Sequence, residues 1–263
     1  MRLSGLRRHW NEYGRSDPLW AILTAPDKKG NRWSIEEFLQ TGRDEIAQLM
    51  AYLDERRITV ARGRALDFGC GAGRVTHALA THFDHAIGLD IAPSMVAKAR
   101  ELHGSLPNVE FRVNTSDRLE SIESESIDLV YTRLVLQHMP PRYIRTYLAE
   151  FVRVLRPGGV AVFQLPGENA RPVAARRGGL KGLLPAPVIS MIRAVRDLRD
   201  FPRMELHGVP RAEVEQLMAG LGAPVVDTVD DRAHGADTPG YRYCAVKIAP
   251  PITAAKARPT SSM

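Results

Sequence analysis

The sequence predicts an α/β protein in which parallel strands alternate with helices. Two observations support this. The run Ala65–Gly73 is an apolar strand followed by a glycine-rich turn, and a second apolar run ends in the carboxylate of Asp90. Between them, residues 74–83 place Val75 and Leu79 at helical spacing. Such a unit belongs to a parallel sheet that holds its ligand at the carboxyl ends of the strands.

Length and composition fit one globular enzyme. The chain has 263 residues, of which 44% are hydrophobic and 25% charged, as is ordinary for a soluble domain. Cys70 and Cys244 form neither a disulfide framework nor a metal-ligand spacing, so we expect a reducing, cytoplasmic location. No run is long enough to cross a bilayer, and we expect no membrane partner. The net charge of +6 leaves open an anionic partner or a solvated, arginine-rich surface.

Residues 1–60 precede the first strand and are predicted to form a helical extension. Ser34 and Glu37 have the spacing of a capping box, which opens a helix. Thr41–Asp44 has the composition of a second helix start, with apolar residues following at helical spacing. These signals predict two helices within this stretch.

Aromatic residues gather upstream of these helices. Trp10, Tyr13 and Trp20 lie within eleven residues of one another. In one interpretation they belong to a lid over the ligand, with Trp20 in contact with the substrate. In the other they only fix the helices to the core, and the sequence does not decide between the two.

The residues in and around the glycine turn restrict the class of ligand that it can bind. Gly69, Gly71 and Gly73 lack a Cβ atom, so the backbone can turn sharply and approach a ligand closely. Their spacing differs from the Gly-x-Gly-x-x-Gly pattern that binds a dinucleotide pyrophosphate. The carboxylate of Asp67 opposes a pyrophosphate and favours a cationic ligand, whereas Asp90 is placed to accept hydrogen bonds from ribose hydroxyls.

These residues resemble the class I S-adenosylmethionine-dependent methyltransferases. The resemblance implies a Rossmann-like, seven-stranded, mostly parallel sheet with helices on both faces and an antiparallel pair of strands at the edge. It also implies that the glycine turn holds the methionine part of S-adenosylmethionine and that Asp90 binds its ribose. The predicted cofactor-binding residues are Asp67, Gly69, Cys70, Gly71, Gly73, Arg74, Asp90, Ile91, Met95, Ser116, Asp117 and Arg133.

The resemblance continues along the chain. Residues 111–117 look like the third strand, whose following acid, Asp117, faces the adenine amino group in this family. Residues 126–131 look like the fourth strand, and residues 153–163 like the Leu-Arg-Pro-Gly-Gly turn and the fifth strand. Glycine turns after strands also occur in flavin and nicotinamide enzymes and in other α/β loops, and it is the complete order of the elements that favours a methyltransferase.

His138 is the predicted catalytic residue. It follows the fourth strand, and several small-molecule O-methyltransferases of this family have a histidine in this segment. An alcohol must lose its proton when it is methylated, and histidine can accept one near neutral pH. In the alternative, His138 only orients the loop or packs beneath the cofactor.

Residues 166–209 are longer than the connection that the family leads us to expect after the fifth strand. They are rich in arginine, and residues 187–199 have helical spacing, so we predict a helical cap over the ligand. Arginine binds carboxylate, phosphate or sulfate groups, which would suit an anionic acceptor. The alternative is a solvated cationic helix face. The predicted substrate-binding residues are Trp20, Glu168, Arg196 and His234.

The loop after the sixth strand has residue types that suit a hard metal ion. These residues are Asp230, Asp231, His234 and Asp237. Clusters of this composition are more often polar loops, and we predict no metal site.

The predicted organisation has five parts. They are a helical extension (1–60), the cofactor-binding half (61–165), the cap (166–209), the C-terminal part of the domain (210–248) and a disordered tail (249–263). We expect a monomer or a homodimer.

The function predicted is transfer of a methyl group from S-adenosylmethionine to a small molecule, at a hydroxyl oxygen of a glycoside, polyketide or other secondary metabolite. The alternatives are N- or C-methylation, nucleic-acid methylation through the basic cap, and a noncatalytic cofactor-binding module. The family's Asn/Asp-Pro-Pro-aromatic motif for amino groups is absent after the fourth strand, where the sequence is Tyr131–Leu134. A nucleic-acid partner is therefore not expected.

Overall fold

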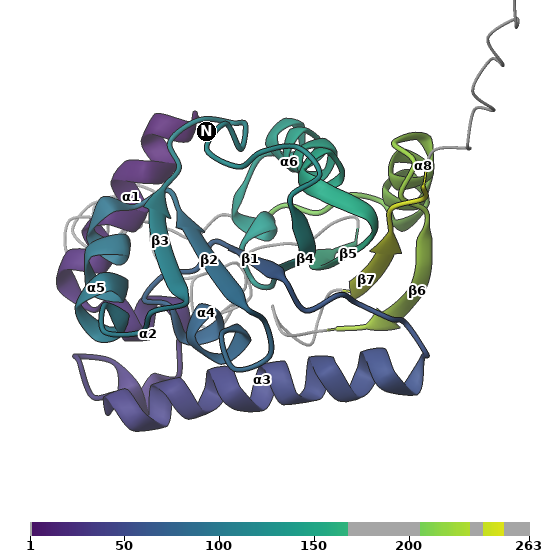
Figure 1. The fold of residues 1–263 in the computed structure, drawn as a ribbon. Coiled ribbons are helices and arrows are strands. Elements are labelled where there is room, and N and C mark those ends of the chain that lie inside the picture. The colour runs from purple at the N-terminus through teal and green to yellow at the C-terminus, as the bar shows by residue number, and fades with distance from the viewer. Residues whose placement is uncertain (1, 168–205, 232–238, 250–263) are drawn as a thin grey trace, which may run out of the picture.

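A seven-stranded sheet forms the centre of the computed structural model, which describes residues 2–167, 206–231 and 239–249. The strands lie in the order β3-β2-β1-β4-β5-β7-β6 (Figure 1). All pairings are parallel except those of β7, which is antiparallel to both β5 and β6. The strands are β1 (Arg64–Phe68), β2 (His85–Asp90), β3 (Val109–Val113), β4 (Ile127–Thr132), β5 (Leu155–Pro166), β6 (Val225–Asp230) and β7 (Gly240–Val246). The predicted fold is confirmed.

Helices cover both faces of this sheet because successive strand side chains point to opposite sides. Ala65 faces α3 and α4, whereas its neighbour Leu66 faces α6. The α-helices are α1 (Leu3–Ser16), α2 (Pro18–Ile22), α3 (Ile35–Glu55), α4 (Arg74–Leu79), α5 (Pro93–His103), α6 (Pro141–Val154) and α8 (Arg211–Gly220). Short 3-10 helices are η1 (Pro26–Lys28) and η2 (Leu136–His138). The helices cover the two faces of the sheet, so the candidate site lies at the ends of the central strands.

The register brings the ends of three strands to one edge of the sheet. Asp67 of β1 pairs with Tyr131 of β4, and Phe68 of β1 pairs with Leu89 of β2. Because these strands are parallel, the residues that follow them emerge side by side. Asp67, Asp90 and Tyr131 therefore lie at the same edge.

The prediction of two helices between residues 34 and 55 is wrong, because α3 is one helix of 21 residues. Its predicted capping box is present, with Ser34 accepting from the Glu37 amide. The helix continues through Gly42 because the glycine permits close packing: a Cβ atom there would lie 2.2 Å from the carbonyl oxygen of Arg74. Thr41 is also kept within the helix, where its hydroxyl donates to the carbonyl of Phe38.

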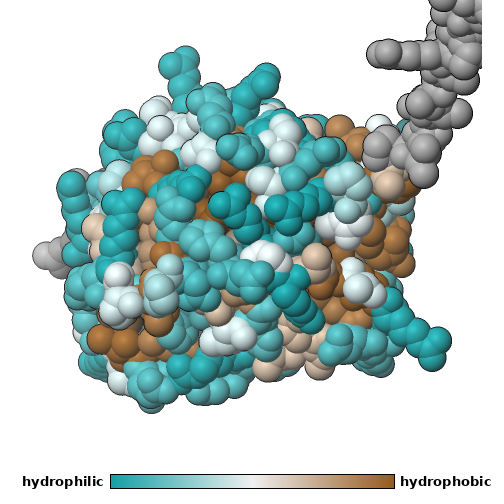
Figure 2. Space-filling model, viewed as in Figure 1, coloured by the Kyte–Doolittle hydropathy of each residue, from teal (hydrophilic) through white to brown (hydrophobic). Residues whose placement is uncertain are grey.

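The surface carries hydrophilic and hydrophobic residues in mixture. Figure 2 shows hydrophilic residues spread over the viewed face, with hydrophobic ones in separate patches. Within the described ranges, no helix is long and apolar enough to cross a membrane. Most of the predicted cap (166–209) and tail (249–263) lies outside the described residues, namely 168–205 and 250–263, and the proposed domain boundaries stay predictions.

Candidate functional site

The glycine turn between β1 and α4 is tied to the end of β2. Gly69, Gly71 and Gly73 all have positive φ angles, of 80°, 52° and 84°, which side chains with a Cβ atom rarely adopt. The amides of Gly69 and Cys70 both donate to the carbonyl of Leu89, at 2.7 and 2.9 Å. The Cys70 thiol is buried, and burial raises its pKa well above the usual value, so it stays neutral. The turn therefore presents backbone amides rather than a reactive thiol.

Asp90 ends β2 and holds the turn by its side chain. Its Oδ2 accepts a hydrogen bond from the Gly71 amide at 2.9 Å, and its Oδ1 accepts from the Ala92 amide at 2.8 Å. Burial raises the pKa of this carboxyl, and the backbone N–H groups partly offset that rise. Each carboxylate oxygen has a second lone pair, so Asp90 can also accept hydrogen bonds from a ligand.

Asp67 is a second acid beneath the turn. It is buried, and the Thr76 hydroxyl of α4 donates to its Oδ2 at 2.6 Å. Burial raises its pKa to about 7, while the hydrogen bond from Thr76 and the charge of Arg74 act in the opposite direction. A positive ligand at this position would favour the ionised form of Asp67.

A buried charged cluster joins the N-terminal extension to the site. Glu45 of α3 accepts from Nη2 of Arg74 at 2.8 Å, from the Tyr131 hydroxyl at 2.8 Å and from Nη1 of Arg133 at 3.3 Å. Arg133 also pairs with Asp231, which follows β6, at 3.0 and 3.2 Å. Burial opposes the ionisation of Glu45, but the charges of Arg74 and Arg133 lower its pKa overall. The cluster therefore fixes Arg74 and Arg133, both predicted to bind the cofactor.

Glu45 was missed by sequence reasoning, although one signal marks it. It lies three residues after Gly42 and four before Leu49, both of which are buried on α3. An acid on the buried stripe of a helix needs a partner inside the protein. The sequence alone does not say that the partners come from α4 and from the segment around the end of β4.

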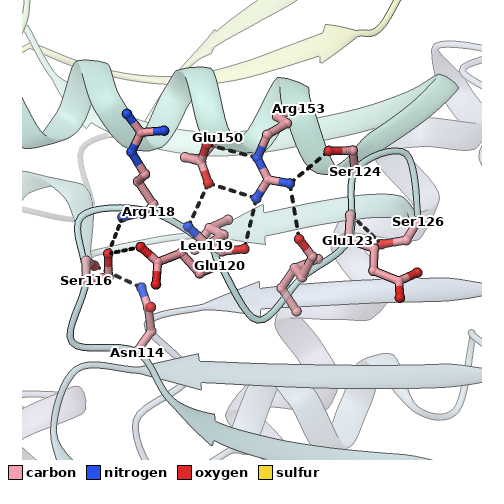
Figure 3. Close-up of polar contacts among 11 residues, drawn as sticks. Asn114, Ser116, Arg118, Leu119, Glu120, Glu123, Ser124, Ser126, Glu150 and Arg153 are labelled. Carbon is pink, nitrogen blue, oxygen red and sulfur yellow. Dashed lines mark hydrogen bonds and ion pairs between the residues drawn. The ribbon is translucent and has the colours of Figure 1, made fainter.

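The segment after β3 is held by α6. Figure 3 shows Glu150 accepting from the Leu119 amide and Arg153 donating to the Leu119 carbonyl, at 2.7 and 2.8 Å. Nδ2 of the buried Asn114 donates to the carbonyl of Ser116 at 3.2 Å, and its backbone amide donates to the carbonyl of Asp90. Asn114 was not predicted. Ser116 is partly buried and Asp117 is exposed, and their roles toward the cofactor stay predictions.

The first helix docks on the start of α5, close to Asp90. Asn11 accepts from the Ser94 amide through Oδ1 at 3.0 Å and from the Ser94 hydroxyl through its carbonyl at 2.8 Å. Met95, a predicted cofactor contact, is buried in a cluster with Tyr13. Ile22 of α2 lies over the glycine turn, since a Cβ atom on Gly71 would come within 2.5 Å of its Cδ1. Together α1 and α2 form an N-terminal helical pair that covers the turn.

His138 lies beneath this helical pair, in η2 after β4. It is 8% exposed, its Nε2 lies 3.3 Å from Nε2 of Gln137, and the Trp10 ring contacts it at 5.2 Å between centroids. The preceding Leu134 has a positive φ of 62°, and its amide donates to Gln164. Backbone strain of this kind gathers at functional sites.

Trp20, the aromatic residue predicted to contact the substrate, has partners of its own in the N-terminal region. Its indole N–H donates to the carbonyl of Ala25 at 2.9 Å, and the Lys29 ammonium lies over its ring. Trp10 is the aromatic residue that the structure brings to His138. The predicted substrate-binding residues Glu168, Arg196 and His234 lie outside the described residues. Among the residues that are described, no three His, Cys, Asp or Glu side chains gather as a metal site would require.

The sheet order, the glycine turn and the acid after β2 define the class of protein: an α/β protein built to hold a nucleoside cofactor at the ends of its parallel strands. Residues 65–159 match the methyltransferase domain family. That segment therefore carries a methyltransferase domain, in agreement with the resemblance found in the sequence, and S-adenosylmethionine is the cofactor expected.

Two relatives match the chain over part of its length. The ubiquinone biosynthesis O-methyltransferase of Hahella chejuensis is 32% identical over 122 residues, covering 46% of this chain and 50% of that protein. The trans-aconitate 2-methyltransferase of Methylobacterium radiotolerans is 36% identical over 131 residues, covering 49% of this chain and 48% of that protein. The chain thus spans about half the length of the relatives it matches.

A solved structure extends the likeness of the fold to most of the chain. Magnesium protoporphyrin IX methyltransferase from Synechocystis PCC 6803, with bound SAH, superimposes with a TM-score of 0.60. The match covers 93% of this chain and 99% of that chain at 15% identity. At this identity the match establishes the fold alone.

Proposed function

We propose that the protein transfers a methyl group from S-adenosylmethionine to a small-molecule acceptor. The observation that carries the proposal is the contact between Asp90 and the glycine turn, in which Oδ2 accepts from the Gly71 amide at 2.9 Å. This contact brings a carboxylate next to a glycine backbone with positive φ angles, at the carboxyl ends of β1 and β2. That combination suits a ribose next to a thioether or sulfonium chain.

The residues present fit the cofactor in charge. When bound, S-adenosylmethionine supplies an electrophilic methyl group on a positively charged sulfur. Asp67 and Asp90 offer negative charge for the ammonium group and the ribose hydroxyls respectively. S-adenosylmethionine carries no phosphate group. A cofactor with phosphate groups would be repelled by the two acids at the turn.

We infer that the acceptor is methylated at oxygen and that His138 accepts its proton. His138 lies after β4 on the same edge as the glycine turn, and the Trp10 ring contacts it in an edge-to-face arrangement. The amide nitrogen of Gln137 contacts Nε2, so this contact has to break before Nε2 can accept the proton of the acceptor. A base held in place in this way speeds methylation of a hydroxyl more than methylation of an amine, which needs less help to lose a proton.

The relatives support a small acceptor. One is named for ubiquinone biosynthesis and the other for trans-aconitate, a small polycarboxylate. Both names describe small molecules and not polymers. An anionic acceptor also agrees with the chain's net charge of +6.

The test starts with the cofactor, because the acceptor is unidentified. Isothermal titration of S-adenosylhomocysteine into the wild type and Asp90→Ala should show at least about tenfold weaker binding in the variant, since the hydrogen bonds to a charged acceptor are lost. Glu110→Ala, at an acid of β3 away from the turn, is the matched control and should bind normally. Equal affinity in the wild type and Asp90→Ala would refute the site.

Methyl transfer is then followed with S-adenosylmethionine labelled in the methyl group. The acceptors tried are phenols, small carboxylic acids and, as a contrast, nucleic acid. Label on a phenol or carboxylate supports the proposal, and label on nucleic acid alone contradicts it. His138→Gln should lower turnover on an accepted phenol, whose hydroxyl must lose a proton, and leave S-adenosylhomocysteine binding unchanged.

A further inference from the structure

Gln137 of η2 is a buried amide with an unused hydrogen-bond acceptor. The residue is only 4% exposed, and its backbone carbonyl accepts from the His207 amide at 2.7 Å. Its side-chain Nε2 lies 3.3 Å from Nε2 of His138, but its buried Oε1 has no hydrogen-bond partner among the residues that the structure describes. A buried acceptor without a partner costs free energy, so such an atom normally meets a donor.

The segment that carries Gln137 borders the glycine turn. A Cβ atom on Gly69 would come within 2.4 Å of both Cγ atoms of Val135, which lies just before η2. The residue that follows Gln137 is His138, which contacts the Trp10 ring. Gln137 therefore lies next to the proposed base, in a segment that abuts the turn proposed to hold the cofactor.

The proposed role of His138 determines which way the Gln137 amide is turned. A base that accepts a proton at Nε2 carries a lone pair on that atom, and a lone pair pairs with the N–H groups of an amide. The amide nitrogen of Gln137 makes this contact, which directs Oε1 away from the imidazole nitrogen. Oε1 is therefore left as an acceptor beside the base.

The chemistry of Oε1 restricts the group that can pair with it. An amide oxygen only accepts, so its partner must be an O–H or N–H group, and an ionised carboxylate cannot be that partner. The nitrogen that contacts the base and Oε1 are bonded to the same carbon of Gln137. A molecule that reaches both the base and Oε1 must therefore carry its two groups close together, as two hydroxyls on adjacent carbons do.

Resting on the proposed function, we propose that Gln137 determines acceptor specificity by accepting a hydrogen bond from a second hydroxyl, next to the one that is methylated. The acceptor class is a vicinal diol, either aromatic or in a sugar ring. The first hydroxyl takes the place of the Gln137 amide nitrogen at His138 and gives its proton there. The second hydroxyl donates to Oε1 and so orients the molecule.

The test compares acceptors that differ by one hydroxyl, using S-adenosylmethionine labelled in the methyl group. The pairs are catechol with phenol, and a methyl hexoside with its monodeoxy analogue. For at least one pair, the kcat/KM of the wild type should be at least about tenfold higher for the diol, because the compound with one hydroxyl fewer leaves Oε1 unpaired.

Two substitutions of Gln137 then locate this preference. Gln137→Met keeps the length of the side chain and removes the acceptor oxygen, so kcat/KM for the diol should fall at least about tenfold and the preference should disappear. The ratio between the two acceptors divides out any effect on the base, because both give their proton to His138. Gln137→Glu keeps an oxygen that accepts hydrogen bonds and should retain part of the preference.

Gln40→Met is the matched control. Gln40 is an exposed glutamine of α3 whose amide donates to Asp44 on the same helix. This variant should keep the full preference for the diol. Binding of S-adenosylhomocysteine with the affinity of the wild type shows, for each variant, that the protein is folded.

The inference fails if the wild type methylates both members of each pair equally well, if it methylates neither diol, or if Gln137→Met keeps the preference. The first two outcomes need no variant, so the test decides even if Gln137→Met does not fold. Methylation of another small acceptor would leave the proposed function intact in each case. A wild type that does not bind S-adenosylhomocysteine would instead overturn the proposed function.

Discussion

The two sides of the site are built in different ways. On the side of β1 and β2, the glycine turn and Asp90 are joined by contacts within one strand–turn–helix–strand unit, such as Gly71 to Asp90. On the side of β4, His138 is surrounded by distant segments, with Trp10 from the first helix and Gln164 from β5 around its loop. The first side is a local motif that a sequence pattern can specify, whereas the second depends on how the whole chain folds.

The charged cluster around Glu45 connects the two sides, and breaking it should have the largest effect. Glu45→Ala leaves Arg74 buried without its ion pair and Arg133 with Asp231 alone. Breaking a buried pair by removing one partner is strongly destabilising, so we expect a loss of about 3 kcal/mol in the free energy of unfolding, measured in urea.

The matched control for this loss is Glu36→Ala on the same helix. Glu36 pairs with Arg43, but its side chain is 79% exposed. An exposed pair contributes about 1 kcal/mol or less. If the two variants lose the same stability, the cluster around Glu45 does not connect the two sides in the way described.

A smaller effect is expected from the pH dependence of ligand binding, which should distinguish Asp67 from Asp90 on the side of β1 and β2. The pKa of Asp67 is raised to about 7 by burial, so it is partly protonated in the free protein near neutral pH. A ligand ammonium favours the ionised form and lowers this pKa, so binding releases a proton. The affinity for S-adenosylhomocysteine should therefore rise with pH from 6 and level off above about 7, by up to about tenfold per unit.

Titration calorimetry between pH 6 and pH 8 measures this dependence. The pKa of Asp90 is also raised by burial, so Asp67→Asn is needed to separate the two acids. That variant removes one titrating group and keeps a side chain that can accept from Thr76. An Asp67→Asn profile as steep as that of the wild type would assign the pH dependence to Asp90 instead.

What the sequence could predict follows the same division. The seven-stranded, mostly parallel sheet, the glycine turn, the capping box at Ser34 and the antiparallel last strands were all predicted, because each has a local pattern or a family motif behind it. The continuity of α3 was not predicted, since Gly42 reads as a helix boundary until Arg74 is seen packed against it. Glu45 was missed because its partners lie on other elements, and Asn114 because its backbone amide bonds to Asp90 of the neighbouring strand.

The aromatic residues of the N-terminal region show most clearly what a sequence pattern cannot predict. Trp10 and Trp20 are the same residue type, and both lie in the predicted N-terminal extension. Only the docking of α1 on α5 determines that Trp10 reaches His138 while Trp20 turns to Ala25. Which aromatic residue faces the site is decided by tertiary contacts, and no local pattern encodes those.

The smallest expected effect concerns the docking of α1 on α5. Amide exchange measured segment by segment compares the two sides of the site in a single variant. Asn11 caps α5 from another helix, because its Oδ1 accepts from the Ser94 amide at 3.0 Å and α5 has no side-chain cap of its own. Losing a cap costs about 1 kcal/mol, so Asn11→Ala should raise amide exchange over residues 3–16 roughly fivefold. Exchange in β1 and β2 should stay as in the wild type, because the glycine turn is held by Leu89 and Asp90.

Arg7→Ala, on the exposed side of α1, serves as the control. Faster exchange in β1 and β2 as well would mean that the first side also depends on the N-terminal helical pair, and the contrast between a local and a long-range half of the site would not hold.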